Sequence, residues 1–91
     1  MSRVEVRAYE LLERMLEQAE ANNPAGVLSL NKEYESLHPL LLPNSQLLYD
    51  LCRQSCVLGF TFIPLEKERL LQDARVRFTQ LPVPDGYTKT A

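Results

Sequence analysis

Two cysteines and one histidine are the residues of this 91-residue chain best suited to metal or redox chemistry. Cys52 and Cys56 lie four residues apart, a spacing that places both thiols on one face of a helix. A zinc site needs about four ligands, and His38 is the only histidine available to join them. The alternative is that both cysteines are small buried core residues, as free cysteines usually are. We expect this alternative, and therefore neither a metal site nor a disulfide.

Carboxylates near the start of the chain are the candidates for acid–base chemistry. They recur on the polar side of an amphipathic pattern, which predicts a solvated helix face rather than a catalytic pair. His38 lies at a predicted helix end, where an imidazolium interacts favourably with the helix dipole, and we favour this role over that of a general base. The sequence has no glycine-rich phosphate loop or nucleophile elbow, so we expect no enzyme activity and no cofactor. The carboxylates concerned are Glu10, Glu13, Glu17 and Glu20.

Composition and charge narrow the function further. The net charge is −2, and the cations late in the chain alternate with acids, which argues against a nucleic-acid binder. No apolar run approaches the roughly 20 residues that span a bilayer, and the first residues lack the apolar core of a secretory signal. We therefore expect a cytoplasmic protein without membrane insertion. The cations are Lys67, Arg69, Arg75 and Arg77, and the acids are Glu66, Glu68 and Asp73.

Helical periodicity and abundant leucine predict an all-α domain over residues 1–80, a small antiparallel three- or four-helix bundle. The first helix begins at Ser2, which forms a capping box with Glu5, and ends near Asn22. Asn23 caps the second helix, and Pro24 suits its first position. Because this turn is short, the first two helices should form an antiparallel hairpin.

The second half of the chain contains two further helical patterns. The third helix should be capped by Asn44, with Leu47 and Leu48 among its inward-facing residues, and should end near residue 58. The fourth helix begins at Pro64. Residues 81–91 contain two prolines and a polar end, which predicts a flexible, non-helical C-terminal tail.

Two connectors between the predicted helices are unusually apolar. Residues 40–42 are three leucines between two prolines, and Phe60 and Phe62 follow a glycine. We treat residues 60–63 as extended or as a continuation of the third helix. These side chains either close the ends of the bundle or lie exposed for a partner, and the sequence favours neither alternative.

Part of the first half of the chain resembles a known family. The stretches concerned are residues 11–23 (LLERMLEQAEANN), 27–30 (VLSL) and 34–37 (YESL). They resemble the small flagellar type III export chaperones of the class that serves the filament-cap protein. The resemblance implies an all-helical protein that binds a helical segment of an export substrate or export-apparatus subunit without a cofactor. The sequence departs from the family where Pro24 replaces an aromatic residue at the second helix, and where Pro43, Gly59 and Pro64 interrupt its second half.

These observations together favour a non-catalytic protein-binding module, a chaperone or adaptor that sequesters an apolar helix of a partner. An alternative is a small acidic inhibitor or immunity-type protein, in which Glu13, Glu17 and Glu20 contact an enzyme and salt slows association. A homodimer is also open, because a chain this small buries a modest core. The expected contact residues are Leu40, Leu41, Leu42, Phe60 and Phe62.

Overall fold

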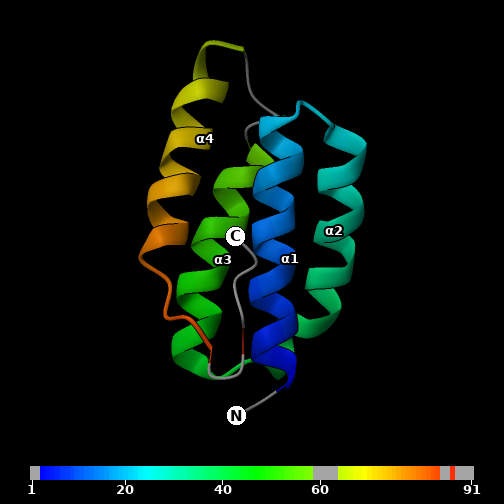
Figure 1. Ribbon diagram of the computed structural model, residues 1–91, viewed down its shortest axis with the longest axis vertical. Coiled ribbons are helices and arrows are strands. Elements are labelled where there is room, and N and C mark those ends of the chain that lie inside the picture. The colour runs from blue at the N-terminus through cyan, green and yellow to red at the C-terminus, as the bar shows by residue number, and fades with distance from the viewer. Residues whose placement is uncertain (1–2, 59–63, 85–86, 88–91) are drawn as a thin grey trace.

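The computed structural model describes residues 3–58, 64–84 and 87, and within them all regular structure is helical. The α-helices are α1 (Arg3–Glu20), α2 (Pro24–Leu37), α3 (Pro43–Leu58) and α4 (Pro64–Thr79), and a 3₁₀ turn, η1 (His38–Leu40), follows α2. The helices run up and down beside one another as an antiparallel bundle (Figure 1). The expected all-α bundle is therefore confirmed, with four α-helices in this part of the chain.

Helix α1 is one of two helices, together with α3, that contact all the other α-helices. It packs against α2, α3 and α4, and Figure 1 shows α2 and α4 on opposite sides of it. One face of α1 supplies a large part of the core, including Leu11, Leu12 and Met15, whose side chains have no solvent-exposed surface. The amphipathic pattern of this helix is thus explained by burial against three neighbours.

The joint between α1 and α2 is built from two consecutive asparagines. Asn22 adopts a positive φ of 58°, and the N–H groups of Asn22 and Asn23 donate to the carbonyls of Ala19 and Gln18 at 3.1 and 2.9 Å. This pattern is a Schellman motif, which satisfies carbonyls at the end of a helix. The Asn23 side chain also accepts from the Gly26 N–H at 3.2 Å and donates to the Gln18 side chain at 2.7 Å. Asn23 therefore ends α1 and caps α2, as its expected capping role requires.

Gly26 is needed where α2 passes closest to this joint. A β-carbon there would lie 2.8 Å from Oε1 of Gln18 and 2.9 Å from Nδ2 of Asn23. These two atoms form the hydrogen bond that fixes the joint. A larger residue at position 26 would therefore push this bond apart.

Helix α3 differs from its expected orientation and start. Cys52 and Cys56 face the core as expected, and Tyr49 does so too. Leu47 and Leu48 are exposed, so the inward orientation predicted for these two leucines is wrong. Positions 49, 52 and 56 also recur at helical spacing, so periodicity does not separate the two faces of this helix. The helix begins at Pro43, because proline suits the first helical position, and the Leu42 carbonyl accepts its first hydrogen bond from Gln46 N at 2.9 Å.

The segment after α4 is non-helical, as expected, and its described residues lie against the helices. Leu81 and Pro84 are buried, and Tyr87 packs against the core. Figure 1 shows residues 80–84 continuing from the end of α4 toward the end of the bundle that carries the start of α1. The flexibility expected for residues 81–91 stays a prediction.

Asn23→Ala should lower the free energy of unfolding by about 1 kcal/mol, because the side-chain cap of α2 is lost. Chemical denaturation followed by circular dichroism measures this change. Asn44→Ala is the matched control, since Asn44 lies inside α3 and caps no helix. An equal loss of stability in both variants would contradict the assigned role of Asn23.

Candidate functional site

Exposed apolar side chains gather at one end of the bundle. Seven large apolar side chains are strongly exposed among the described residues, and five of them come from residues 40–48 and 83. These two segments meet at the end of the bundle that carries the start of α1 (Figure 1). We call this surface the leucine end, and it consists of Leu40, Leu42, Leu47, Leu48 and Val83. Such a concentration marks an interaction surface more often than singly scattered apolar residues do.

The leucine end carries no charge of its own. Residues 39–49 and 78–84 contain no aspartate, glutamate, lysine or arginine, although these types make up 24% of the whole chain. The charged residues lie instead along the helices, where several of them form ion pairs. Examples are Arg14 with Glu10 at 3.4 Å, Arg77 with Asp73 at 2.8 Å, and Arg75 with Glu20 at 2.9 Å. The leucines therefore come from charge-free runs of the sequence, although the carboxylates of Glu5 and Asp50 border the same end of the bundle.

A buried carboxylate holds the connector that presents these leucines. Glu5 is only 3% exposed, and its Oε1 accepts a hydrogen bond from the Leu42 N–H at 3.0 Å. This N–H precedes the first turn of α3 and has no partner within that helix. The bond therefore joins the start of α1 to the start of α3, across 37 residues of sequence.

Two further contacts fix the same connector. Leu41 is 4% exposed and belongs to the core cluster, so it anchors the connector while Leu40 and Leu42 on either side point outward. The Gln46 side-chain amide donates to the carbonyls of His38 and Leu41 at 3.2 and 3.1 Å. The backbone that carries the exposed leucines is thus fixed by contacts on both sides of Leu41.

Two hollows flank this connector. One has a volume of 120 Å³ and lies between Leu42 and Tyr49 on one side and residues 82–84 on the other. The second has a volume of 280 Å³ and is lined by His38, Pro43, Gln46, Leu47 and Asp50. Apolar side chains border both hollows, so the leucine end offers recesses as well as projecting side chains.

The predicted contact residues are divided by the structure. Leu40 and Leu42 are exposed, at 65% and 61%. Leu41 is buried in the core, which leaves its side chain almost no surface for a partner, so its expected role as a contact is corrected to that of an anchor. Phe60 and Phe62 lie outside the described residues. Sequence reasoning missed the exposure of Leu47, Leu48 and Val83, although the charge-free run from residue 39 to 49 was a signal for it.

The cysteine pair lies in the core, as expected. Both side chains are fully buried, and the Cys52 thiol donates to the Ala74 carbonyl at 3.6 Å. The hydrogen bond with Cys52, together with burial, raises the pKa of the Cys56 thiol far above its ordinary value. The described residues include no group of three side chains able to hold a metal ion. The pair therefore fills space and offers no reactive thiolate.

The glutamates of α1 are largely engaged within the molecule. Glu13 accepts a hydrogen bond from the Tyr87 hydroxyl, Glu20 pairs with Arg75, and Glu10 pairs with Arg7 and Arg14. Three of these glutamates were predicted to contact an enzyme. Glu13 and Glu20 have the partners just named, and Glu17 is exposed to solvent. The acidic face consequently has less free charge than its sequence suggests.

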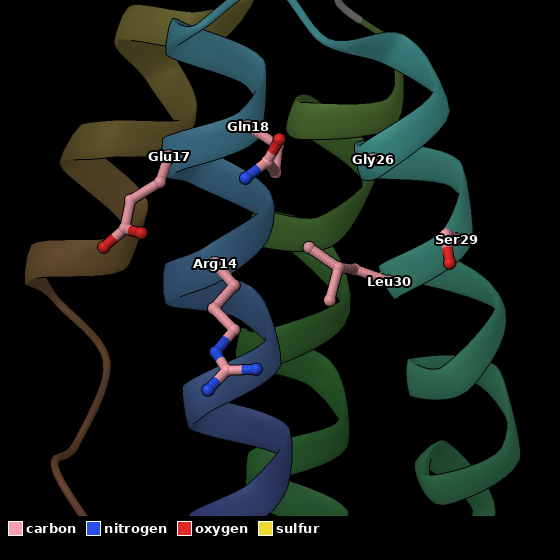
Figure 2. A pocket seen from close by; sticks show the side chains of 6 residues that line it. All are labelled: Arg14, Glu17, Gln18, Gly26, Ser29 and Leu30. Carbon is pink, nitrogen blue, oxygen red and sulfur yellow. The ribbon is translucent and has the colours of Figure 1, made fainter.

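A wider groove runs between α1 and α2 on another side of the bundle. Its volume is 430 Å³, and Figure 2 shows Arg14 and Leu30 pointing into it while Glu17 points away. Gln18, Gly26 and Ser29 complete the lining. This lining is polar and contains neither a pair of carboxylates nor an activated nucleophile, so we place the candidate site at the leucine end.

Comparison with protein-family models, curated proteins and solved structures finds no match to this chain. Among the described helices, none has the length and apolar character needed to cross a membrane. The case for a function therefore depends on the geometry of the leucine end.

Glu5→Ala should lower the free energy of unfolding by about 2 kcal/mol, because the hydrogen bond from the Leu42 N–H to the buried Glu5 side chain is lost. Glu5→Gln retains an acceptor oxygen and should lose clearly less. Denaturant titration of both variants measures the difference. Equal losses would show that the hydrogen bond to Leu42 contributes nothing.

Both thiols should resist a thiol reagent at pH 8 in the folded protein, because they are fully buried and the pKa of Cys56 is raised. In denaturant, both should react at once. Absorbance of the released reagent anion measures the rate. Reaction of the folded protein at the unfolded rate would contradict this assignment and would support a thiol sensor.

Proposed function

We propose that this protein is a non-catalytic binding module, a cytoplasmic chaperone or adaptor that binds an amphipathic helix of a partner protein at the leucine end. The observation that supports this proposal is the gathering of Leu40, Leu42, Leu47, Leu48 and Val83 at one end of the bundle, in two runs of the sequence without charged residues. Burial of such side chains against a partner stabilises a complex by roughly 2 kcal/mol for each fully buried leucine.

The shape of the leucine end supports a helix as the ligand. An amphipathic helix presents apolar side chains at positions i, i+3, i+4 and i+7, which enter successive recesses of a receptor. The hollows on either side of the connector supply such recesses, with Leu42 bordering one and Leu47 the other. Because residues 39–49 are uncharged, the contacting stripe of the partner should be apolar and uncharged as well.

The resemblance of stretches within residues 11–37 to flagellar type III export chaperones supports a protein-binding function of the same kind. In that family the ligand is a helical segment of an export substrate or of an export-apparatus subunit. The acidic-inhibitor alternative has less support, because Glu13 and Glu20 are engaged with Tyr87 and Arg75. We therefore place the partner contact at the apolar end.

The double variant Leu42→Asp/Leu47→Asp should abolish partner binding while the bundle stays folded, because both side chains are exposed, at 61% and 65%. Leu28→Asp is the matched control, since Leu28 is 54% exposed but lies on α2, outside the leucine end. Tagged forms of all three chains are used to capture partners from the native extract. The wild type and the control should recover the same stoichiometric protein, which the double variant should lose.

Titration calorimetry of the recovered partner then tests the nature of the contact. When the salt concentration is raised from about 50 to about 500 mM, the dissociation constant should change by less than about threefold, because an interface without charges has little electrostatic attraction for salt to screen. A strong salt dependence together with binding by the double variant would overturn the proposal and would favour the acidic face.

A further inference from the structure

The described residues after α4 lie along a set of aromatic side chains. We call residues 81–84 and 87 the C-terminal strap, and Tyr9, Tyr49 and Phe78 the aromatic platform. The Tyr9 ring is central to the platform, with ring centroids 4.9 Å from Phe78 and 6.3 Å from Tyr49. The Tyr87 ring meets Tyr9 edge to face at 4.7 Å. The strap therefore covers an aromatic surface contributed by three different helices.

The chemistry of the strap is that of a proline-rich ligand. Its sequence reads Leu81-Pro82-Val83-Pro84, so two residues have a fixed φ and the two that precede them are restricted to extended conformations. Prolines donate no backbone hydrogen bond, so the backbone of this segment can be held only through its carbonyls and the N–H groups of the other residues. The Tyr49 hydroxyl donates to the Pro82 carbonyl at 3.3 Å. The platform thus contacts both the rings and the backbone of the strap.

This combination matches a recurring mode of peptide recognition. Aromatic-lined surfaces bind extended proline-containing segments, whose preformed conformation reduces the entropy lost on binding. Here Pro84 is buried, Leu81 belongs to the core cluster, and the hollow beside Leu42 is lined by both prolines. The Tyr87 hydroxyl donates to the Glu13 carboxylate, which supplies a polar anchor beyond the prolines.

We propose that the aromatic platform is a binding site for an extended segment of a partner protein that carries a Pro-x-Pro sequence followed by a tyrosine. The strap is the intramolecular occupant of this site, and a partner segment binds by displacing it. The competition lowers the apparent affinity of the partner by the fraction of molecules in which the platform is free. This site adjoins the leucine end, because Val83 belongs to both and one hollow is lined by Leu42, Tyr49 and the strap, but it does not require the leucine end to bind a helix.

A labelled peptide with the sequence of residues 79–91 tests the proposal by fluorescence anisotropy against full-length protein. The Tyr87→Ala chain should bind it about tenfold more tightly than the wild type, because its own strap competes less well. In this background, Tyr49→Phe should weaken binding about fivefold through loss of the hydroxyl donor. Tyr34→Phe is the matched control and should change nothing, since the buried Tyr34 hydroxyl has no hydrogen-bond partner among the described residues.

A peptide in which both prolines are replaced by alanine should bind at least about fivefold more weakly, because it is not preformed in the extended conformation. Equal affinity of the two peptides, or equal affinity of the wild type and the Tyr87→Ala chain, would overturn the proposal. Should Tyr87→Ala fail to fold, NMR titration of the wild type decides. Peptide-induced shifts at Tyr9, Tyr49 and Phe78 support the site, and their absence at saturating peptide refutes it.

Discussion

The hydrogen bond from the Leu42 N–H to the buried Glu5 carboxylate is the interaction on which the candidate site depends. A carboxylate removed from water is costly unless it accepts hydrogen bonds, and a helix start has N–H groups that need acceptors. The hydrogen bond satisfies both groups and thereby holds the start of α1 against the start of α3. Leu41 then fills the core, and its two neighbours are left on the surface. The fold of the connector therefore determines that Leu40 and Leu42 are exposed.

Local signals predicted the parts of this structure that depend on neighbouring residues. Asn23 and Pro24 predicted the start of α2. The sequence predicted a local role for Glu5 in a capping box with Ser2. It did not predict the contact of Glu5 with Leu42, because the two residues lie 37 positions apart in the chain. Long-range pairing of this kind has no periodic signature in a single sequence.

The candidate site was predicted only in part, for a related reason. Leu40, Leu41 and Leu42 are identical in type, so nothing in the sequence says which of them turns inward. In α3 both Leu47 and Tyr49 belong to helical stripes, and the choice between the stripes is made by the neighbours that α3 packs against. The run of three leucines between two prolines was the signal that marked this region, because large apolar side chains in a connector are either buried or exposed for a partner.

The position of α1 against all three other helices has a consequence for the motions of the chain. A bundle made of two independent hairpins can open at the seam between them while each hairpin persists. In this protein each interface between α1 and another helix also borders the common core, so local opening of one interface breaks several contacts together. The low-energy fluctuations should accordingly be confined to segments outside this helix.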